Sequence, residues 1–114
     1  MSIPKHQYIY RIQPNRPELL TDGPTKSEAK ILRDHVAYIE GLVDSANILL
    51  AGRTQTADPN GFGIVIVSAS SEEEGRAIMD EDPVVKTSLM KAEFFTYKIA
   101  FLSDSILQVT KNDA

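Results

Sequence analysis

The spacing of hydrophobic residues changes along the chain, and this change constrains the fold more than any other sequence feature. Residues 6–13 place Tyr8, Tyr10 and Ile12 at every second position, which is the pattern of a strand with one buried face. Beyond residue 27 the apolar residues instead recur at spacings of three and four, as in an amphipathic helix. The change of period therefore predicts a strand followed by a long helix.

A capping box marks the start of this helix. Thr25 stands three residues before Glu28, the spacing at which each side chain can bond to the other residue's backbone N–H, and Ser27 is an equally good N-cap. We expect the helix to begin there and to end at about Ser45 or Ala46.

A second helix is predicted by the same kind of pattern. Ser71 precedes Glu74 by three residues, and the acidic residues after Ser71 suit the positive end of a helix dipole. This helix should end at about residue 80 or 81, because Pro83 cannot continue it.

Three further segments have the composition of strands. Residues 47–54 and 62–68 are rich in Ile, Leu and Val, and residues 57–61 between them favour a reversal, so they predict a hairpin. Residues 92–102 alternate in the manner of a last strand. One face of that strand would carry Phe95, Tyr97, Ile99 and Phe101, and the other Phe94, Thr96 and Lys98.

Two segments hold no long regular element. Pro14–Thr25 contains three prolines and a glycine, which predicts an ordered loop that could cover a cleft. The tail, Ser103–Ala114, either adds a short edge strand at Ile106–Val109 or frays.

The resulting order is strand-helix-strand-strand-helix-strand. It predicts an α+β, ferredoxin-like βαββαβ fold, in which both helices lie on one face of an antiparallel sheet. We expect a single domain over residues 1–114, with a core at about 6–102 and a tail at 103–114. The opposite sheet face would expose either the tyrosines of the first strand or alternating residues of the last one. We therefore predict a homodimer that packs sheet to sheet.

Composition excludes several classes of protein. Twelve Lys and Arg are scattered among sixteen Asp and Glu, for a formal net charge of −4, so the chain offers no basic surface for nucleic acid. No apolar run approaches the ~20 residues that cross a bilayer, and residues 1–6 lack a signal-peptide core. We expect a cytoplasmic protein with no membrane partner. The chain has no Cys, which leaves His, carboxylates, Tyr and hydroxyl groups for chemistry.

His35 is the leading candidate for a functional residue. It falls among the apolar residues of the long helix, so its imidazole should point toward the sheet. The strongest candidate partner is Asp82, which directly precedes Pro83. If a carboxylate orients one ring nitrogen, the other can take a proton from a substrate and return it elsewhere, as isomerisation and elimination require.

Both residues also have a purely structural interpretation. A histidine on an apolar helix face is more often hydrogen-bonded to backbone. An aspartate before proline is an ordinary N-cap for a short helix that begins at Pro83. A cap leaves one oxygen free for His35, so the two interpretations of Asp82 are compatible.

Other candidate substrate contacts are Arg53, Arg11 and Tyr8. A guanidinium can hold an anionic substrate group, although either arginine can equally be an ion-paired surface residue. Tyr8, Tyr10 and Tyr38 can each supply a hydroxyl to a pocket, although tyrosines in strands and helices more often provide apolar contact area.

We predict neither a metal nor a cofactor. The acidic clusters 72–74 and 80–82 lack the ligand spacing of a calcium loop, and nothing links His6 to His35. The sequence also has no phosphate-binding glycine loop, dinucleotide fingerprint or nucleophile elbow.

Four segments together resemble the YCII-related (YciI-like) family. In chain order they are Asp34-His35-Val36-Ala37-Tyr38-Ile39, Leu50-Ala51-Gly52-Arg53, Asp58-Pro59-Asn60-Gly61-Phe62-Gly63 and Asp82-Pro83-Val84-Val85. The resemblance implies a dimeric α+β barrel, with His35 and Asp82 as an acid/base pair in a small cleft. It also implies lyase or isomerase chemistry on small, often aromatic-derived compounds.

The chain departs from the family pattern at two places. Gly52-Arg53 stands where the family usually has Gly-Pro, and Val84 and Ser88 stand where it often has an aromatic residue and a glycine. The resemblance therefore does not imply the pocket lining or the ligand.

Our leading hypothesis is a small-molecule acid/base enzyme of the lyase or isomerase type, with His35 as base and Asp82 as its orienting partner. The main alternative is a non-catalytic dimeric domain that binds a small ligand or serves as an accessory. A third hypothesis, that the protein is a cofactor-free monooxygenase, rests on fold analogy alone.

Overall fold

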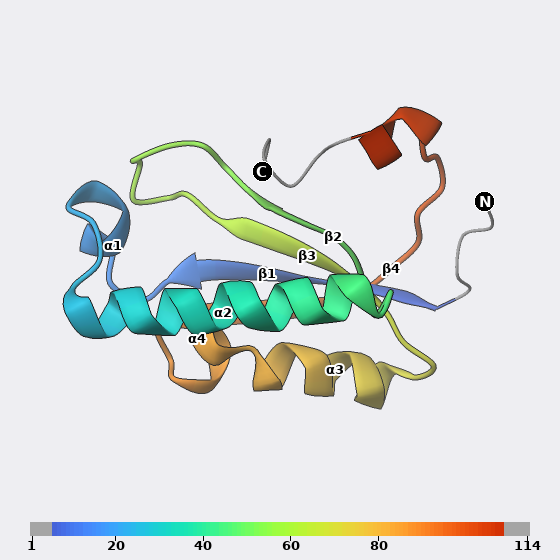
Figure 1. The fold of residues 1–114 in the computed structure, drawn as a ribbon, viewed down its shortest axis with the longest axis horizontal. Helices are drawn as coiled ribbons and strands as arrows, with labels where there is room; N and C mark the ends of the chain where they lie inside the picture. Colours follow the sequence, from blue (N-terminus) through green and yellow to red (C-terminus); the bar gives the residue numbers. More distant parts are fainter. Residues whose placement is uncertain (1–5, 109–114) are drawn as a thin grey trace.

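Strands and helices form two layers in the computed structural model, which describes residues 6–108 (Figure 1). In chain order the elements are β1 (Gln7–Pro14), α1 (Glu18–Thr21), α2 (Lys26–Asp44), β2 (Ile48–Arg53), β3 (Gly63–Ser68), α3 (Glu72–Glu81), α4 (Pro83–Lys86), β4 (Met90–Tyr97) and the 3₁₀ helix η1 (Asp104–Gln108). The longer elements follow the predicted order, α4 is the short helix that the sequence offered after Asp82, and the structure adds the short helices α1 and η1.

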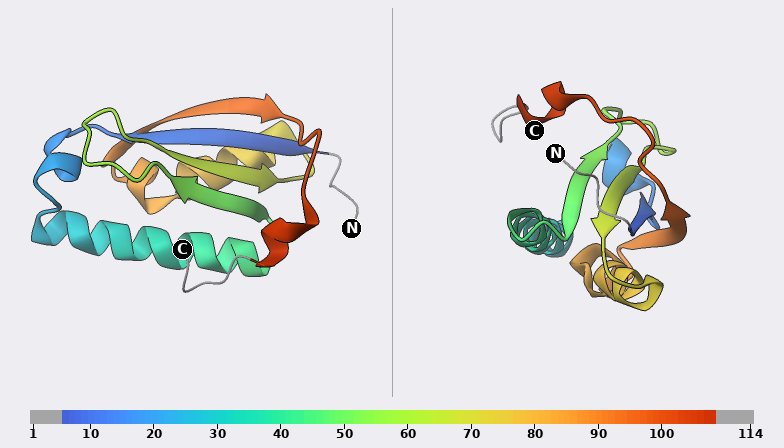
Figure 2. Two further views of the ribbon diagram at one scale, coloured as in Figure 1. Left: turned by 90° about the horizontal axis from the view of Figure 1, so that it is seen from above. Right: turned by 90° about the vertical axis from the view of Figure 1, so that its right-hand side faces the viewer.

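The four strands form one antiparallel sheet with the order β2-β3-β1-β4. β1 is flanked on both sides, with Tyr10 opposite Val65 of β3 and Phe94 of β4. β2 and β3 pair as the predicted hairpin. The helices α2, α3 and α4 lie against one face of the sheet (Figure 2). The predicted ferredoxin-like α+β fold is therefore confirmed.

The face of β1 that carries Tyr8, Tyr10 and Ile12 packs beneath the helices. Tyr10 is fully buried, and Tyr8 and Ile12 are also buried. The other members of this core are Leu19, Ile48, Val65, Val67, Ala69, Met79, Val84 and Leu89. The tyrosine face is thus the covered face of the sheet, which leaves the other face free of helices.

α2 packs on this core through a partly buried stripe. The residues that pack against the core are Ile31, Leu32, Ile39 and Leu42. Val36 and Val43 follow the same apolar periodicity along the helix but do not face the sheet, because they are 52% and 44% exposed. Both lie about a quarter of a helical turn from the middle of the stripe, where His35 stands.

Helix capping follows the sequence prediction closely. Thr25 and Glu28 form the full capping box at the start of α2. Ser71 accepts a hydrogen bond from the Glu74 N–H, but the Glu74 carboxylate bonds to the Ser70 hydroxyl instead. The second box is therefore only half formed.

The proline-rich segment before α2 contains the four-residue helix α1, where the sequence predicted only a loop. Arg16 donates to both carboxylate oxygens of Glu28, at 2.9 and 2.5 Å, and to the Gly23 carbonyl at 3.4 Å. The Arg16 hydrogen bond, followed by that from the Thr25 N–H, lowers the pKa of Glu28 to about 2. The carboxylate that caps α2 thus also holds this segment against the helix.

β4 ends earlier than predicted. Its pairing with β1 stops at Tyr97, opposite Gln7, because β1 begins there. Ile99 and Phe101 therefore do not extend a strand face, and the Ile99 N–H instead donates to the Gln7 side chain at 2.7 Å. Phe95 and Tyr97 lie on the helix-free face and are 48% and 43% exposed.

The segment that follows β4 crosses one end of the helix-free face and ends in η1 (Figure 2). Asp104–Gln108 forms a 3₁₀ helix where the sequence offered an edge strand from Ile106 to Val109. Val109 itself lies outside the described residues. No helix within residues 6–108 has the length and apolar character needed to span a bilayer.

Candidate active site

His35 and Asp82 are in direct contact, although 47 residues separate them in the sequence. His35 Nδ1 lies 2.6 Å from Asp82 Oδ1. The aspartate is fully buried, whereas the histidine side chain keeps 20% of its surface exposed. The pair therefore joins α2 to the α3–α4 junction and presents an ionisable ring partly to solvent.

The local backbone explains why a carboxylate is buried here. Asp82 ends α3 and begins α4, with the extended backbone (φ −60°, ψ 125°) that a following proline imposes. Pro83 has no N–H, and the next amide, that of Val84, donates to Asp82 Oδ1 at 3.2 Å. Asp82 is thus both the predicted N-cap and the predicted partner of His35.

Tyr10 supplies a third hydrogen-bond donor from β1. Its hydroxyl donates to Asp82 Oδ2 at 2.7 Å, and the whole residue is buried. Burial, followed by the adjacent carboxylate, raises the pKa of Tyr10 well above its ordinary value. The phenol therefore stays protonated and remains a donor.

Tyr38, about one turn beyond His35 on α2, connects that helix to α3. Its hydroxyl donates to the Ile78 carbonyl at 2.6 Å. Burial, followed by the negative charges of Asp82 and Glu81, raises the pKa of Tyr38 to about 12. Tyr38 thus stiffens the junction of the two helices beside the His35–Asp82 pair.

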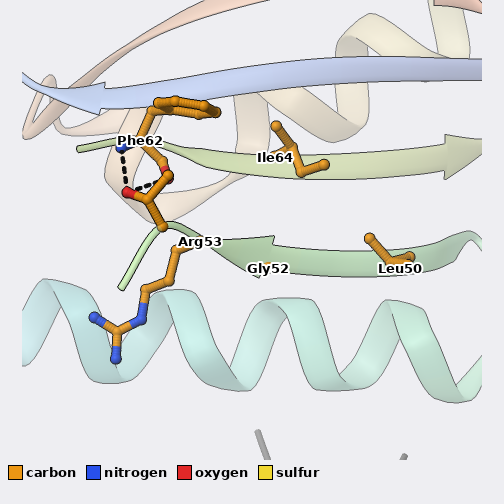
Figure 3. A pocket seen from close by; sticks show the side chains of 6 residues that line it. Leu50, Gly52, Arg53, Phe62 and Ile64 are labelled. Carbon is orange, nitrogen blue, oxygen red and sulfur yellow. Dashed lines mark hydrogen bonds between the residues drawn. The ribbon is translucent and has the colours of Figure 1, made fainter. Parts of the chain in front are cut away.

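The other three predicted site residues lie in different surroundings. Arg11 forms an ion pair with Glu93 at 3.2 Å, and its guanidinium lies 4.4 Å from the centre of the Phe62 ring. The Tyr8 ring stacks on Phe94 in the core, with ring centres 5.4 Å apart. Figure 3 shows Arg53 extending from the end of β2 toward α2.

Two of the shallow depressions on the surface of the described residues lie near the candidate residues or the sheet end. The first, of about 240 Å³, lies at the end of the β2–β3 pair and is lined by Leu50, Gly52, Arg53, Thr54, Phe62 and Ile64 (Figure 3). The second, of about 450 Å³, follows the groove between α2 and α3 and is lined by Tyr38, Leu42, Asn47, Glu74, Ala77, Ile78 and Glu81. His35 and Asp82 line neither depression. Two of its lining residues are close to the pair in sequence, since Glu81 directly precedes Asp82 and Tyr38 lies three residues after His35.

The sequence indicated Tyr10 as a possible source of a hydroxyl group, but it did not predict the hydrogen bond from Tyr10 to Asp82. Its period-two position predicts burial correctly, but its hydroxyl partner lies 72 residues away. No local signal connects a strand tyrosine to an aspartate at a helix junction. The contact arises only because the sheet packs β1 beneath that junction.

The geometry determines which nitrogen of His35 is available for chemistry. An ionised carboxylate can only accept hydrogen bonds, so a ring nitrogen 2.6 Å from Asp82 Oδ1 is the one that carries hydrogen. Nε2 is then the nitrogen that can accept a proton. Within residues 6–108, no three His, Asp or Glu side chains converge to hold a metal ion.

The fold and this contact define a class of protein: a ferredoxin-like α+β chain with a histidine–aspartate pair between its helices. The chain belongs to the YCII-related family, because it matches the YCII-related domain over residues 8–96, a range that includes both His35 and Asp82. No curated protein matches the sequence.

Among solved structures, the chain is similar to 5-chloro-2-hydroxyhydroquinone dehydrochlorinase (TftG) from Burkholderia phenoliruptrix AC1100, determined in complex with 2,5-dihydroxybenzoquinone. The TM-score is 0.57 at 22% sequence identity, and the match covers 80% of this chain and 93% of that chain. At this identity the similarity shows a shared fold.

Proposed function

We propose that this protein is a small-molecule enzyme of the acid/base type, which catalyses an elimination or an isomerisation with His35 as general base. The observation that carries the proposal is the 2.6 Å contact between a partly exposed imidazole and a fully buried carboxylate. In such a pair the carboxylate fixes the ring and stabilises the imidazolium that forms during proton transfer.

The proposed reaction begins when His35 Nε2 takes a proton from a carbon or hydroxyl group of the substrate. In an elimination, the electron pair left behind forms a double bond as a leaving group departs from a neighbouring position with its own electron pair. In an isomerisation, the imidazolium returns the proton to a different atom. The dehydrochlorinase named above removes hydrogen chloride, which is a reaction of the first kind.

Two arginines are proposed as substrate contacts. Arg53 is supported by its direction, since it extends toward the helix that carries His35 (Figure 3). Arg11 pairs with Glu93 on the helix-free face, the side of the sheet opposite Tyr10 and the His35–Asp82 pair, so its role as a substrate contact has less support. The packing of Tyr8 on Phe94 instead supports the apolar interpretation of that tyrosine.

We also propose that the protein is a homodimer that packs through its helix-free face. Phe62, Phe95 and Tyr97 are between 36% and 48% exposed, and Phe95 and Tyr97 alternate along this face of β4. An apolar surface of this kind favours association. Light scattering at micromolar concentration should give twice the chain mass for the native protein and the single-chain mass for Phe95→Lys. A native protein that is monodisperse at the single-chain mass would contradict the proposed dimer.

One observation favours the non-catalytic alternative: His35 and Asp82 line neither the depression at the end of the β2–β3 pair nor the groove between α2 and α3. A ligand-binding domain could use the groove between α2 and α3 without proton transfer. The test of function must therefore separate binding from turnover.

The test follows proton abstraction in deuterated water. One probe is 5-chloro-2-hydroxyhydroquinone, whose turnover is measured as chloride release. The other is a panel of small enolisable acids, whose turnover is measured as hydrogen–deuterium exchange in NMR spectra. His35→Asn removes the base but keeps a side-chain N–H directed at Asp82. His6→Asn is the matched control, because it makes the same substitution at the chain's other histidine, which is exposed.

We expect His35→Asn to lower the rate by roughly 10²–10⁴-fold, the usual contribution of a general base, while His6→Asn stays near the native rate. Equal rates for His35→Asn and the native protein would refute the proposal. Binding of 2,5-dihydroxybenzoquinone without turnover of any probe by the native protein would favour the non-catalytic alternative.

A further inference from the structure

We propose that Tyr10 is a positioning residue of this site: its buried hydroxyl keeps Asp82 an unprotonated acceptor, so that a proton entering the His35–Asp82 pair stays on His35. This inference rests on the proposed function of His35, and it assigns a role to a residue with no path to the substrate.

Both carboxylate oxygens of Asp82 accept hydrogen bonds from buried donors. Oδ2 accepts the Tyr10 hydroxyl at 2.7 Å, and Oδ1 accepts the Val84 N–H at 3.2 Å as well as facing His35 Nδ1. A proton placed on Oδ2 would turn the Tyr10 hydrogen away from its acceptor, inside a fully buried environment. A proton placed on Oδ1 would compete with the Val84 hydrogen. Both oxygens are therefore held as acceptors.

Burial makes this arrangement necessary. When His35 gains a proton, an imidazolium faces a carboxylate with no exposed surface, and a buried ion pair carries a large desolvation cost. The competing arrangement moves the Nδ1 proton to Asp82 and leaves two neutral groups. Each hydrogen bond donated to the carboxylate favours its charged form, so the Tyr10 hydroxyl opposes that transfer.

The other ionisable groups that surround Asp82 do not donate to it. Tyr38 of α2 gives its hydroxyl to the Ile78 carbonyl, and Glu81 at the end of α3 bonds to Lys86 of α4 at 3.2 Å. From β1, α2, α3 and α4 together, the side chains that contact the carboxylate in the described structure are Tyr10 and His35. Tyr10 is thus the side chain that can set where the proton resides.

The experiment compares Tyr10→Phe with Tyr8→Phe. Tyr8 is the matched control, because it lies two residues earlier on the same buried strand face and stacks on Phe94. NMR spectra would follow the two ring nitrogens of His35 and the carboxyl carbon of Asp82 while the pH is lowered through the His35 titration.

In the native protein and in Tyr8→Phe, we expect both ring nitrogens to become protonated while the Asp82 carbon keeps its carboxylate shift. In Tyr10→Phe, we expect a ring protonated at Nε2 alone and a carboxyl carbon at the position of the protonated acid. A Tyr10→Phe spectrum that matches the native one would overturn the proposal. A purely packing role for Tyr10 would lower stability without moving either signal.

The native protein alone provides a second test if Tyr10→Phe does not fold. A native Asp82 that takes up the proton while the His35 ring stays neutral also refutes the role of Tyr10. The outcomes remain separate from the test of function, because rates in His35→Asn decide whether the histidine is a base. If His35 is a base and the Tyr10→Phe spectra match the native ones, the role of Tyr10 is refuted while the proposed function stands.

Discussion

Removal of the Asp82 carboxylate should destabilise the protein far more than the loss of one ordinary hydrogen bond would. Asp82→Ala leaves the Tyr10 hydroxyl and the Val84 N–H without an acceptor, and both residues are fully buried. Each orphaned donor costs about 1–3 kcal/mol. His35 adds less, because water can reach its partly exposed ring.

The sum for two buried donors is about 2–6 kcal/mol, which brackets the 3–5 kcal/mol typical of breaking a buried pair. A native protein of this size has about 5–15 kcal/mol in total. At about 4 °C of melting temperature per kcal/mol, a loss of 3–5 kcal/mol is a fall of roughly 12–20 °C. Asp82 should therefore be close to indispensable for folding.

Thermal and urea unfolding would measure this effect, with Asp80→Ala as the matched control on the exposed side of the same helix end. We expect the control to stay within about 0.5 kcal/mol of the native protein, as is usual for surface substitutions. Asp82→Asn should fall between the two, because its amide oxygen can still accept from Tyr10. A loss below about 1 kcal/mol in Asp82→Ala would refute the argument that buried donors depend on this carboxylate.

Two further predictions concern other parts of the fold. Gly75→Ala places a Cβ 2.9 Å from the Tyr8 ring, so an overpacking cost of about 1–3 kcal/mol should exceed the ~1 kcal/mol gain in helix propensity. Gly41→Ala meets open space and should instead raise stability by about 1 kcal/mol in urea unfolding; equal effects at the two glycines would contradict this reasoning. Arg16→Ala should lower stability most above the ordinary Glu28 pKa of 4.5, because the bound carboxylate has its pKa lowered to about 2 and loses this contribution as pH falls. The native and variant unfolding free energies should thus converge as pH falls from 4.5 to about 2, and a constant difference across that range would disprove the assignment.

The fold could be predicted from the sequence because its signals are local. The period-two tyrosines of β1 and the Thr25 capping box each depend on residues within one element, and both appear in the structure as predicted. The misplaced elements depend on partners instead. β4 is shorter than its sequence pattern because β1 supplies no residue to pair beyond Tyr97, and pairing partners cannot be derived from one strand alone.

The candidate site shows the same division. His35 and Asp82 could be paired from the sequence, because one lies in the middle of an apolar helix face and the other precedes a proline at a helix end. The contact of Tyr10 with Asp82 could not be predicted, because this hydroxyl and carboxylate are 72 residues apart and meet only after the sheet and helices have packed. The ion-pair partner of Arg11 could not be predicted either, since its contact with Glu93 depends on the register of two strands.

The position of Asp82 at the junction of α3 and α4 affects how relatives of this protein should be compared. The same carboxylate ends one helix, caps the next and anchors a buried phenol, so an aspartate there is needed whether or not any reaction takes place. An aspartate at this position in another chain would therefore report only that the junction is built the same way. A histidine at position 35 is more informative, because its partly exposed ring contributes less to the fold and can be lost without orphaning a buried donor. Among such relatives, loss of the histidine while the aspartate and tyrosine persist would mark the chains that keep the scaffold but have given up proton transfer.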